Sequence, residues 1–187
     1  MKNPTLADIF KLAAEVLDKA KAQELKLATA ESCTGGLIGA AITSIPGSSS
    51  NFRGGIIAYD NLVKTNVLSV PHGMIQKYGA VSKFVAGSMA KNVLDVVKAD
   101  MAVSVTGVAG PSGGSKEKPV GTVWIGLAFR DDNAPNGVNV TSRLMNFKGM
   151  DRNKVRDATC YEALYTIKKA LDAKASVPAT TPSDTQD

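Results

Sequence analysis

Ser32 and Lys64 are the two residues whose types and setting could together perform nucleophilic chemistry. Ser32 stands in "AESCTGG", where an expected strand gives way to an expected helix, so its hydroxyl can project at a sheet edge. A serine nucleophile needs a base, and a lysine can serve if burial lowers its pKa from about 10.4 toward neutrality. Lys64 lies in the largely apolar stretch "AYDNLVK", five residues after Tyr59. The single histidine, His72, stands in an expected loop with no supporting signal around it.

Each of these residues also has a purely structural interpretation. Ser32 or Thr34 could cap the helix that follows, with Glu31 placed favourably near its positive end, and the stretch taken alone favours that interpretation. A single lysine is most often a solvated surface charge. Cys33 could be a rival nucleophile, but its thiolate would need a cation or base of its own, so we interpret it as a small buried residue.

Three groups along the chain could bind an anion such as a phosphate. The first is the start of the helix after Ser32, where the backbone N–H groups of residues 33–36 could hold a phosphate or an oxyanion. The second is a loop whose glycines would let backbone amides approach an anion, unless it is merely a flexible turn; it contains Thr106, Gly107 and Gly110. The third is the pair Arg152 and Arg156, spaced i, i+4, which could instead be solvated or paired with neighbouring aspartates.

Alternating helix and strand signals must position these groups. Helices are predicted over residues 3–23, 35–47, 61–70, 72–80, 82–100 and 151–174, and strands over 25–32, 52–60, 101–107, 122–130 and 138–147. Thr5 and Ser82 are predicted helix caps, the last two strands are predicted to be antiparallel, and the Gly54–Gly55 pair suggests a bulge or a ligand near the backbone. This order predicts a three-layer α/β/α sandwich around a mixed, mainly parallel sheet, with ligands at the carboxyl ends of strands.

Composition narrows the possible classes of protein. The 187 residues carry a net charge of +5 without a run of four basic residues, so nucleic-acid binding is not expected. One histidine and two distant cysteines give no metal-ligand spacing, and we expect no metal and no cofactor. No apolar stretch approaches the roughly 20 residues that span a bilayer. The absence of a secretory signal predicts a cytoplasmic protein with reduced thiols. We expect one folded domain over residues 1–174 and, because the last residues have little apolar content, a disordered tail over 175–187.

Several stretches, taken in order, resemble the CinA C-terminal-domain family. They are "AESCTGGLIGAAIT", "PGSSSNFRGGIIAYDNLVK", "GAVS", "VTGVAGPSGGSKEKPVGTVWIGLA" and "DRNKVRDATCYEAL". The stand-alone members of that family include nicotinamide mononucleotide (NMN) deamidases. The resemblance therefore implies hydrolysis of NMN to nicotinate mononucleotide and ammonia in pyridine-nucleotide recycling, by metal-free serine amidase chemistry.

The resemblance also implies roles for particular residues. The serine of the "ESCTGG" motif, Ser32, would be the nucleophile, and Tyr59 and Lys64 match the tyrosine and lysine of the family's "AY-x-N-x-x-K" motif. The substrate-binding residues that we expect are Thr34, Gly35, Gly36, Ser48, Thr106, Gly107, Gly110, Arg152 and Arg156. Family members are expected to be homo-oligomers, commonly dimers. The alternative is a noncatalytic nucleotide-binding module, associated with competence or DNA damage, that keeps the same fold.

Overall fold

The computed structural model describes residues 3–176, in which helices and strands alternate in the predicted order. The helices are α1 (Leu6–Ala22), α2 (Leu37–Thr43), α3 (Asn61–Asn66), α4 (His72–Tyr78), α5 (Lys83–Val97) and α6 (Arg152–Ala175), with single 3₁₀ turns η1 (Ser48–Ser50) and η2 (Pro135–Gly137). The strands are β1 (Leu27–Glu31), β2 (Phe52–Ile57), β3 (Met101–Gly107), β4 (Thr122–Arg130) and β5 (Val138–Asn146). None of the helices in these residues is long and apolar enough to cross a bilayer.

The five strands form one mixed sheet in the order β2-β1-β3-β4-β5. β1 pairs in parallel with β2 and β3, whereas β4 is antiparallel to both β3 and β5. All strands except β4 therefore run in the same direction, which confirms the predicted mixed sheet and the predicted antiparallel hairpin. The carboxyl ends of β1, β2 and β3 consequently lie at one edge of the sheet.

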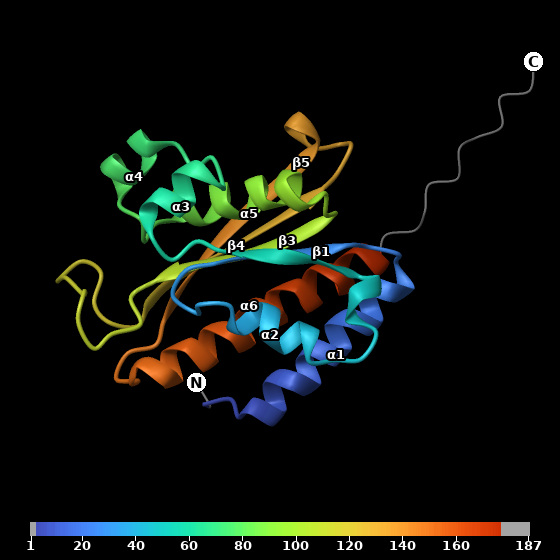
Figure 1. Ribbon diagram of the computed structural model, residues 1–187, viewed down its shortest axis with the longest axis horizontal. Coiled ribbons are helices and arrows are strands. Elements are labelled where there is room, and N and C mark those ends of the chain that lie inside the picture. Colours follow the sequence, from blue (N-terminus) through green and yellow to red (C-terminus); the bar gives the residue numbers. More distant parts are fainter. Residues whose placement is uncertain (1–2, 177–187) are drawn as a thin grey trace, which may run out of the picture.

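Helices cover both faces of this sheet (Figure 1). α1, α2 and α6 pack on one face, and α3, α4 and α5 lie over the other. Successive side chains of β3 point to opposite faces, so Val103 packs in the same core as Leu164 of α6, while Ala102 packs with Met89 of α5. The predicted three-layer α/β/α architecture is confirmed.

Side-chain hydrogen bonds cap the N-termini of α1 and α5, the two helices whose caps were predicted. The Thr5 hydroxyl accepts a hydrogen bond from the Asp8 N–H at 3.2 Å, and the Asp8 carboxylate accepts one from the Thr5 N–H at 2.9 Å, so α1 starts with a reciprocal capping box. The Ser82 hydroxyl accepts from the Val85 N–H at 3.3 Å at the start of α5. Both predicted caps are therefore confirmed.

The Gly54–Gly55 pair accompanies an irregularity between β1 and β2. The pairing register shifts between Leu27 and Ala28, so that β2 carries one extra residue there, as a bulge requires. A Cβ atom on Gly55 would collide with the Thr29 side chain of the adjacent strand. Gly55 thus serves strand packing, whereas Gly54 has a positive φ of +139° and open space where a Cβ would lie, and the predicted bulge is confirmed.

Candidate active site

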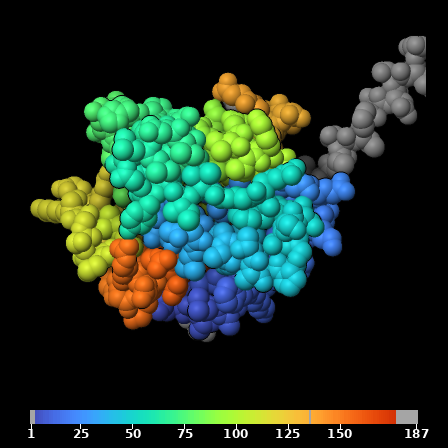
Figure 2. Space-filling model, viewed as in Figure 1, coloured from blue at the N-terminus to red at the C-terminus, as the bar shows by residue number. Residues whose placement is uncertain are grey.

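A cavity lies where the loops after β1, β2 and β3 meet the start of α6. Its volume is about 360 Å³, within the range of small-molecule sites. Figure 2 shows the yellow glycine-rich loop, the orange start of α6 and the blue-green segment around α3 meeting at the left of the molecule. The cavity is lined by Ser32, Cys33, Tyr59, Val81, Gly107, Val108, Ala109, Gly110, Ser112, Gly113 and Arg152.

Ser32 and Lys64 are in direct contact beside this cavity. The Lys64 Nζ atom lies 3.1 Å from Ser32 Oγ, and the two residues are only 1% and 8% exposed. The sheet fixes Ser32, whose N–H donates to the Val105 carbonyl at 3.0 Å. The Asp60 carboxylate caps α3 by accepting from the Leu62 N–H at 2.7 Å, and Lys64 follows one turn later. A nucleophile and a base 3.1 Å apart can exchange a proton without an intermediary.

The surroundings of Lys64 favour its neutral form. Burial lowers the pKa of the Lys64 amine below its ordinary value, against smaller opposing effects of Asp60 and Cys33. Besides Ser32, the Nζ atom has two partners, the carbonyls of Ala58 at 2.7 Å and Tyr59 at 3.2 Å. A neutral amine has two N–H donors and one lone pair. If the two carbonyls take the two N–H groups, the lone pair is left to accept the hydroxyl proton of Ser32.

The turn after Ser32 is held by Glu31 and differs from the prediction. The Gly36 N–H donates to the Glu31 carboxylate at 3.0 Å, and the Gly35 N–H donates to the Ser32 carbonyl at 3.0 Å. These two N–H groups are therefore not available to an anion, contrary to our expectation for residues 33–36. Both glycines have positive φ, +62° and +96°, which explains their presence in the turn.

Thr34 also has protein partners where the sequence suggested substrate. Its hydroxyl donates to Glu31 at 2.7 Å, and its carbonyl accepts from Arg156 Nη2 at 2.9 Å. Within the described residues, the N–H groups of Cys33 and Thr34 donate to no backbone or side-chain oxygen, and the Cys33 N–H meets only its own thiol. Cys33 lines the cavity, whereas Thr34 is fully buried and does not, so the Cys33 N–H is the oxyanion donor that the turn can still supply.

The two arginines of α6 have different partners, although they are one turn apart. Arg152 lines the cavity, and its guanidinium donates to the Gly110 carbonyl at 2.7 Å and to the Tyr59 hydroxyl at 2.9 Å. Arg156 instead reaches the Thr34 carbonyl through Nε and Nη2, at 3.3 and 2.9 Å. The geometry places Arg152 where a ligand could touch it and gives Arg156 a structural contact.

Tyr59 touches Lys64 only through its backbone. Its carbonyl accepts from Lys64 Nζ, whereas the residue as a whole is 58% exposed and its hydroxyl accepts from Arg152. In the described part of the chain, the Tyr59 hydroxyl forms no hydrogen bond with Ser32 or Lys64. The geometry therefore favours direct proton transfer from Ser32 to Lys64 over a transfer through the Tyr59 hydroxyl.

The remaining predicted binding residues are divided between the cavity and other places. Gly107 and Gly110 line the cavity, and a Cβ on Gly107 would lie 2.7 Å from the Thr122 carbonyl of β4. The Thr106 hydroxyl is buried and donates to the Ala80 carbonyl at 3.0 Å. Ser48 lies in η1 before β2, at the amino end of the parallel strands, while the cavity is at their carboxyl end. The chain described here does not bring Ser48 to the cavity.

Neither the alternative nucleophile Cys33 nor the alternative base His72 competes with the pair of Ser32 and Lys64. Burial raises the pKa of the Cys33 thiol to about 12, so the thiolate is disfavoured at neutral pH. His72 is exposed on α4 and is not among the residues that line the cavity. Among the residues that the structure describes, no three His, Cys, Asp or Glu side chains gather in a group that could hold a metal ion.

Comparison with known proteins agrees with the resemblance seen in the motifs. Residues 9–171 match the family model of the CinA C-terminal domain. The chain belongs to this family. A CinA-like protein of Akkermansia muciniphila is 44% identical over 158 residues, which are 84% of this chain and 36% of that protein. The chain thus spans about a third of the length of the curated relatives that it matches.

Solved structures of CinA-superfamily proteins share the fold. The crystal structure of the competence/damage inducible protein CihA from Agrobacterium tumefaciens is 40% identical, with a TM-score of 0.81, over 92% of this chain and 99% of that one. A CinA-superfamily protein from Klebsiella pneumoniae is 29% identical, with a TM-score of 0.81, over 88% of this chain and 98% of that one. The α/β fold derived above is therefore that of the CinA superfamily.

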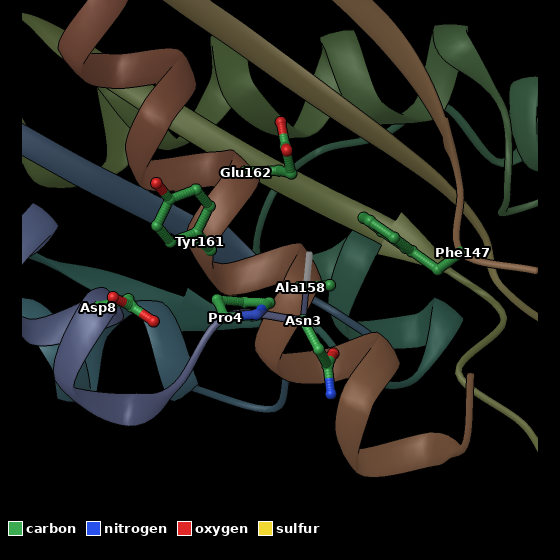
Figure 3. Close-up of a pocket in the computed structure, with 7 residues that line it drawn as sticks. All are labelled: Asn3, Pro4, Asp8, Phe147, Ala158, Tyr161 and Glu162. Carbon is green, nitrogen blue, oxygen red and sulfur yellow. The ribbon is translucent and has the colours of Figure 1, made fainter. Parts of the chain in front are cut away.

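A second cavity, of about 330 Å³, lies between the N-terminal segment and α6 (Figure 3). Its polar side chains include the carboxylates of Asp8 and Glu162 and the hydroxyl of Tyr161. Asp8 belongs to the capping box of α1, and Glu162 is paired with Arg143 at 2.6 Å. Because no serine or lysine lines this cavity, it offers no counterpart of the pair formed by Ser32 and Lys64.

Two features of the CinA-family site could not be recognised by residue type. Glu31 was expected only as a charge near a helix, but its carboxylate organises the whole turn after Ser32. Val81 lines the cavity because Thr106 binds the adjacent Ala80 carbonyl and holds that segment against β3. A valine carries no chemical signal that would mark it in the sequence.

Proposed function

We propose that this CinA-family domain is a nicotinamide-nucleotide amidohydrolase that converts NMN and water to nicotinate mononucleotide and ammonia. The observation that carries the proposal is the 3.1 Å contact between buried Lys64 and Ser32 beside the cavity. A noncatalytic binding module has no need for a nucleophile paired with a desolvated amine. The choice of NMN as substrate rests on the family resemblance of the motifs.

The first half-reaction would form an acyl-enzyme. Ser32 Oγ attacks the carboxamide carbon while its proton passes to Lys64 Nζ, and the negative charge on the carbonyl oxygen is held by the N–H group of Cys33. The tetrahedral intermediate then collapses. The C–N bond breaks as Lys64 returns the proton to the leaving nitrogen, which departs as ammonia and leaves an ester on Ser32.

The second half-reaction would release the acid product. A water molecule takes the place of the ammonia and gives a proton to neutral Lys64 while its oxygen attacks the ester carbon. The C–O bond to Ser32 breaks, and the proton returns from Lys64 to Ser32 Oγ. Nicotinate mononucleotide leaves, and both residues are restored to their starting states.

The cavity also has groups suited to the nucleotide part of the substrate. We assign the phosphate to Arg152, whose guanidinium lines the cavity and keeps N–H donors beyond the two bonds that it makes to Tyr59 and Gly110. The glycines at 107 and 110 let the loop backbone come close to a bound ligand. Arg156 is occupied with Thr34, so we give it no contact with substrate.

Incubation of the purified protein with NMN, followed by measurement of ammonia and nicotinate mononucleotide, tests the proposal. We expect release by the natural sequence and none above background from Ser32→Ala. Equal signals from the two proteins would leave the noncatalytic nucleotide-binding module as the better description. The resemblance further leads us to propose a cytoplasmic homo-oligomer, with a dimer favoured, and light scattering of the purified protein would measure its mass.

A further inference from the structure

Glu31 is a buried acidic residue next to Ser32 to which the proposed reaction gives no role. It is 1% exposed, and its carboxylate accepts four hydrogen bonds. Oε2 accepts from the Thr34 hydroxyl at 2.7 Å and from the N–H groups of Gly36 and Ile38 at 3.0 and 3.1 Å. Oε1 accepts from the Gly39 N–H at 2.8 Å. Burial of a carboxylate is costly unless such donors compensate it, and here they do.

This cap of α2 does not come from the usual position. The N-cap residue is Gly36, which has no side chain, so the orphan N–H groups of the helix are satisfied by a residue five positions earlier. That residue is also the last of β1, and its carbonyl accepts from the Ala58 N–H at 2.7 Å. Glu31 therefore ties the end of the central parallel strands to the start of α2, across the turn that carries Ser32.

We propose that Glu31 is a positioning residue that fixes Ser32 and the oxyanion donor of Cys33 for reaction. The turn of residues 32–36 is short, and Glu31 binds it at Thr34 and Gly36 while Arg156 binds the Thr34 carbonyl from α6. The Glu31 carboxylate takes the N–H groups at the start of α2, and the Cys33 N–H remains for the substrate oxygen. This inference rests on the proposed serine chemistry.

Two variants separate positioning from simple packing. In Glu31→Gln an amide oxygen in place of Oε2 can keep three of the four hydrogen bonds, while the NH₂ group faces the Gly39 N–H. Glu31→Ala loses all four. Because misplacement of a catalytic group by about 1 Å can cost about 100-fold, we expect kcat for NMN to fall about tenfold in the first variant and about 100-fold in the second. KM should stay within about threefold, since the lost alignment acts in the transition state.

The second readout does not depend on NMN. A small sulfonyl fluoride forms a bond from Ser32 Oγ to sulfur as fluoride leaves, and mass spectrometry of the peptide that contains Ser32 gives the rate of labelling. We expect labelling to slow in the same order as kcat. Glu15→Gln is the matched control, because it removes a surface carboxylate that pairs with Lys168, and it should change neither rate. Thermal unfolding identifies any variant that is not folded, and Glu31→Gln keeps the test decisive if Glu31→Ala does not fold.

The outcomes separate the two proposals. Unchanged kcat and unchanged labelling in folded Glu31→Gln would overturn the positioning role and leave the amidohydrolase in place. A slower labelling of Ser32 in that variant, without ammonia release from NMN by any form, would support positioning and reject the substrate. A natural sequence that is neither labelled at Ser32 nor active on NMN would overturn both.

Discussion

Replacement of Lys64 by methionine tests the central step of the proposed reaction. Methionine has a similar length and suits the buried site, but it cannot accept a proton. The Nζ atom lies 3.1 Å from Ser32 Oγ, so the variant loses the direct proton acceptor. General base catalysis contributes about 10²–10⁴-fold. We expect kcat for NMN to fall about 10³-fold, which corresponds to about 4 kcal/mol at 1.4 kcal/mol per decade.

The activity lost when Lys64→Met is combined with Ser32→Ala provides a second test of this prediction. Residues that act as one unit in a reaction lose activity non-additively. Ammonia release should therefore be similar in Lys64→Met, in Ser32→Ala and in the double variant, within about threefold. Lys91→Met, which removes an exposed lysine of α5, is the matched control and should keep full activity.

Two results would refute this reasoning about Lys64. The first is a folded Lys64→Met protein that retains more than about a tenth of the natural kcat, well above the range for a lost base. The second is a double variant whose loss equals the product of the two single losses, which would mean that the residues act independently. Circular dichroism and thermal unfolding show whether each variant is folded. NMN binding by folded Lys64→Met, measured by calorimetry, should be retained.

Three further predictions follow from the same contacts. Arg152→Gln should lower kcat/KM for NMN about 10–100-fold and leave kcat/KM for nicotinamide riboside, which lacks the phosphate, unchanged. Arg156→Gln should lower kcat/KM for the two substrates alike. Equal losses of kcat/KM on the two substrates in Arg152→Gln would contradict a phosphate-binding role for Arg152. Gly36→Ala should lower the free energy of unfolding in urea by about 1–2 kcal/mol, since φ is +96° and the new Cβ would lie 2.9 Å from Ile57, and an unchanged midpoint would contradict this. The lowered pKa of Lys64 means that the unfolded chain binds the extra proton between that pKa and about 10.4, so stability should rise with pH through this window, and Lys64→Met should abolish the rise.

Most of the fold could be predicted because its signals are local. The spacing of Thr5 and Asp8 specifies the start of α1, and Ser82 specifies the start of α5. The alternation of strands and helices along the chain then favours a sheet with layers of helices on its faces. Parallel strands place their carboxyl ends at the same edge of that sheet. The cavity lies at that edge, beside Ser32 and the loop after Thr106, where the sequence predicted a bound ligand. Of the tail predicted over residues 175–187, Ala175 is the last residue of α6 and Ser176 is its C-cap, and residues 177–187 lie outside the described residues.

The division of labour within the site could not be predicted, because it depends on contacts between distant segments. Arg152 and Arg156 share one helix face, and only packing against Gly110 and Thr34 gives them different roles. Ser48 carries a motif hydroxyl, but its place at the amino end of the strands follows from the register of β1 and β2. Periodicity identifies the helix or strand that holds a residue and does not identify the atoms that its side chain will meet.

The two buried ionisable residues nearest Ser32 illustrate why residue type alone does not assign a role. The Glu31 carboxylate accepts four hydrogen bonds, and these bonds fix its position. The hydrogen-bond partners of the Lys64 amine are two carbonyls and the Ser32 hydroxyl. Because burial lowers the pKa of this amine, it can lose its extra proton and then accept one from Ser32. Lys64, whose positive charge is disfavoured by burial, can transfer protons, whereas Glu31, whose negative charge is stabilised by four donors, makes the turn rigid. Ser32 needs both neighbours, because a nucleophile must be activated and must also be held in place.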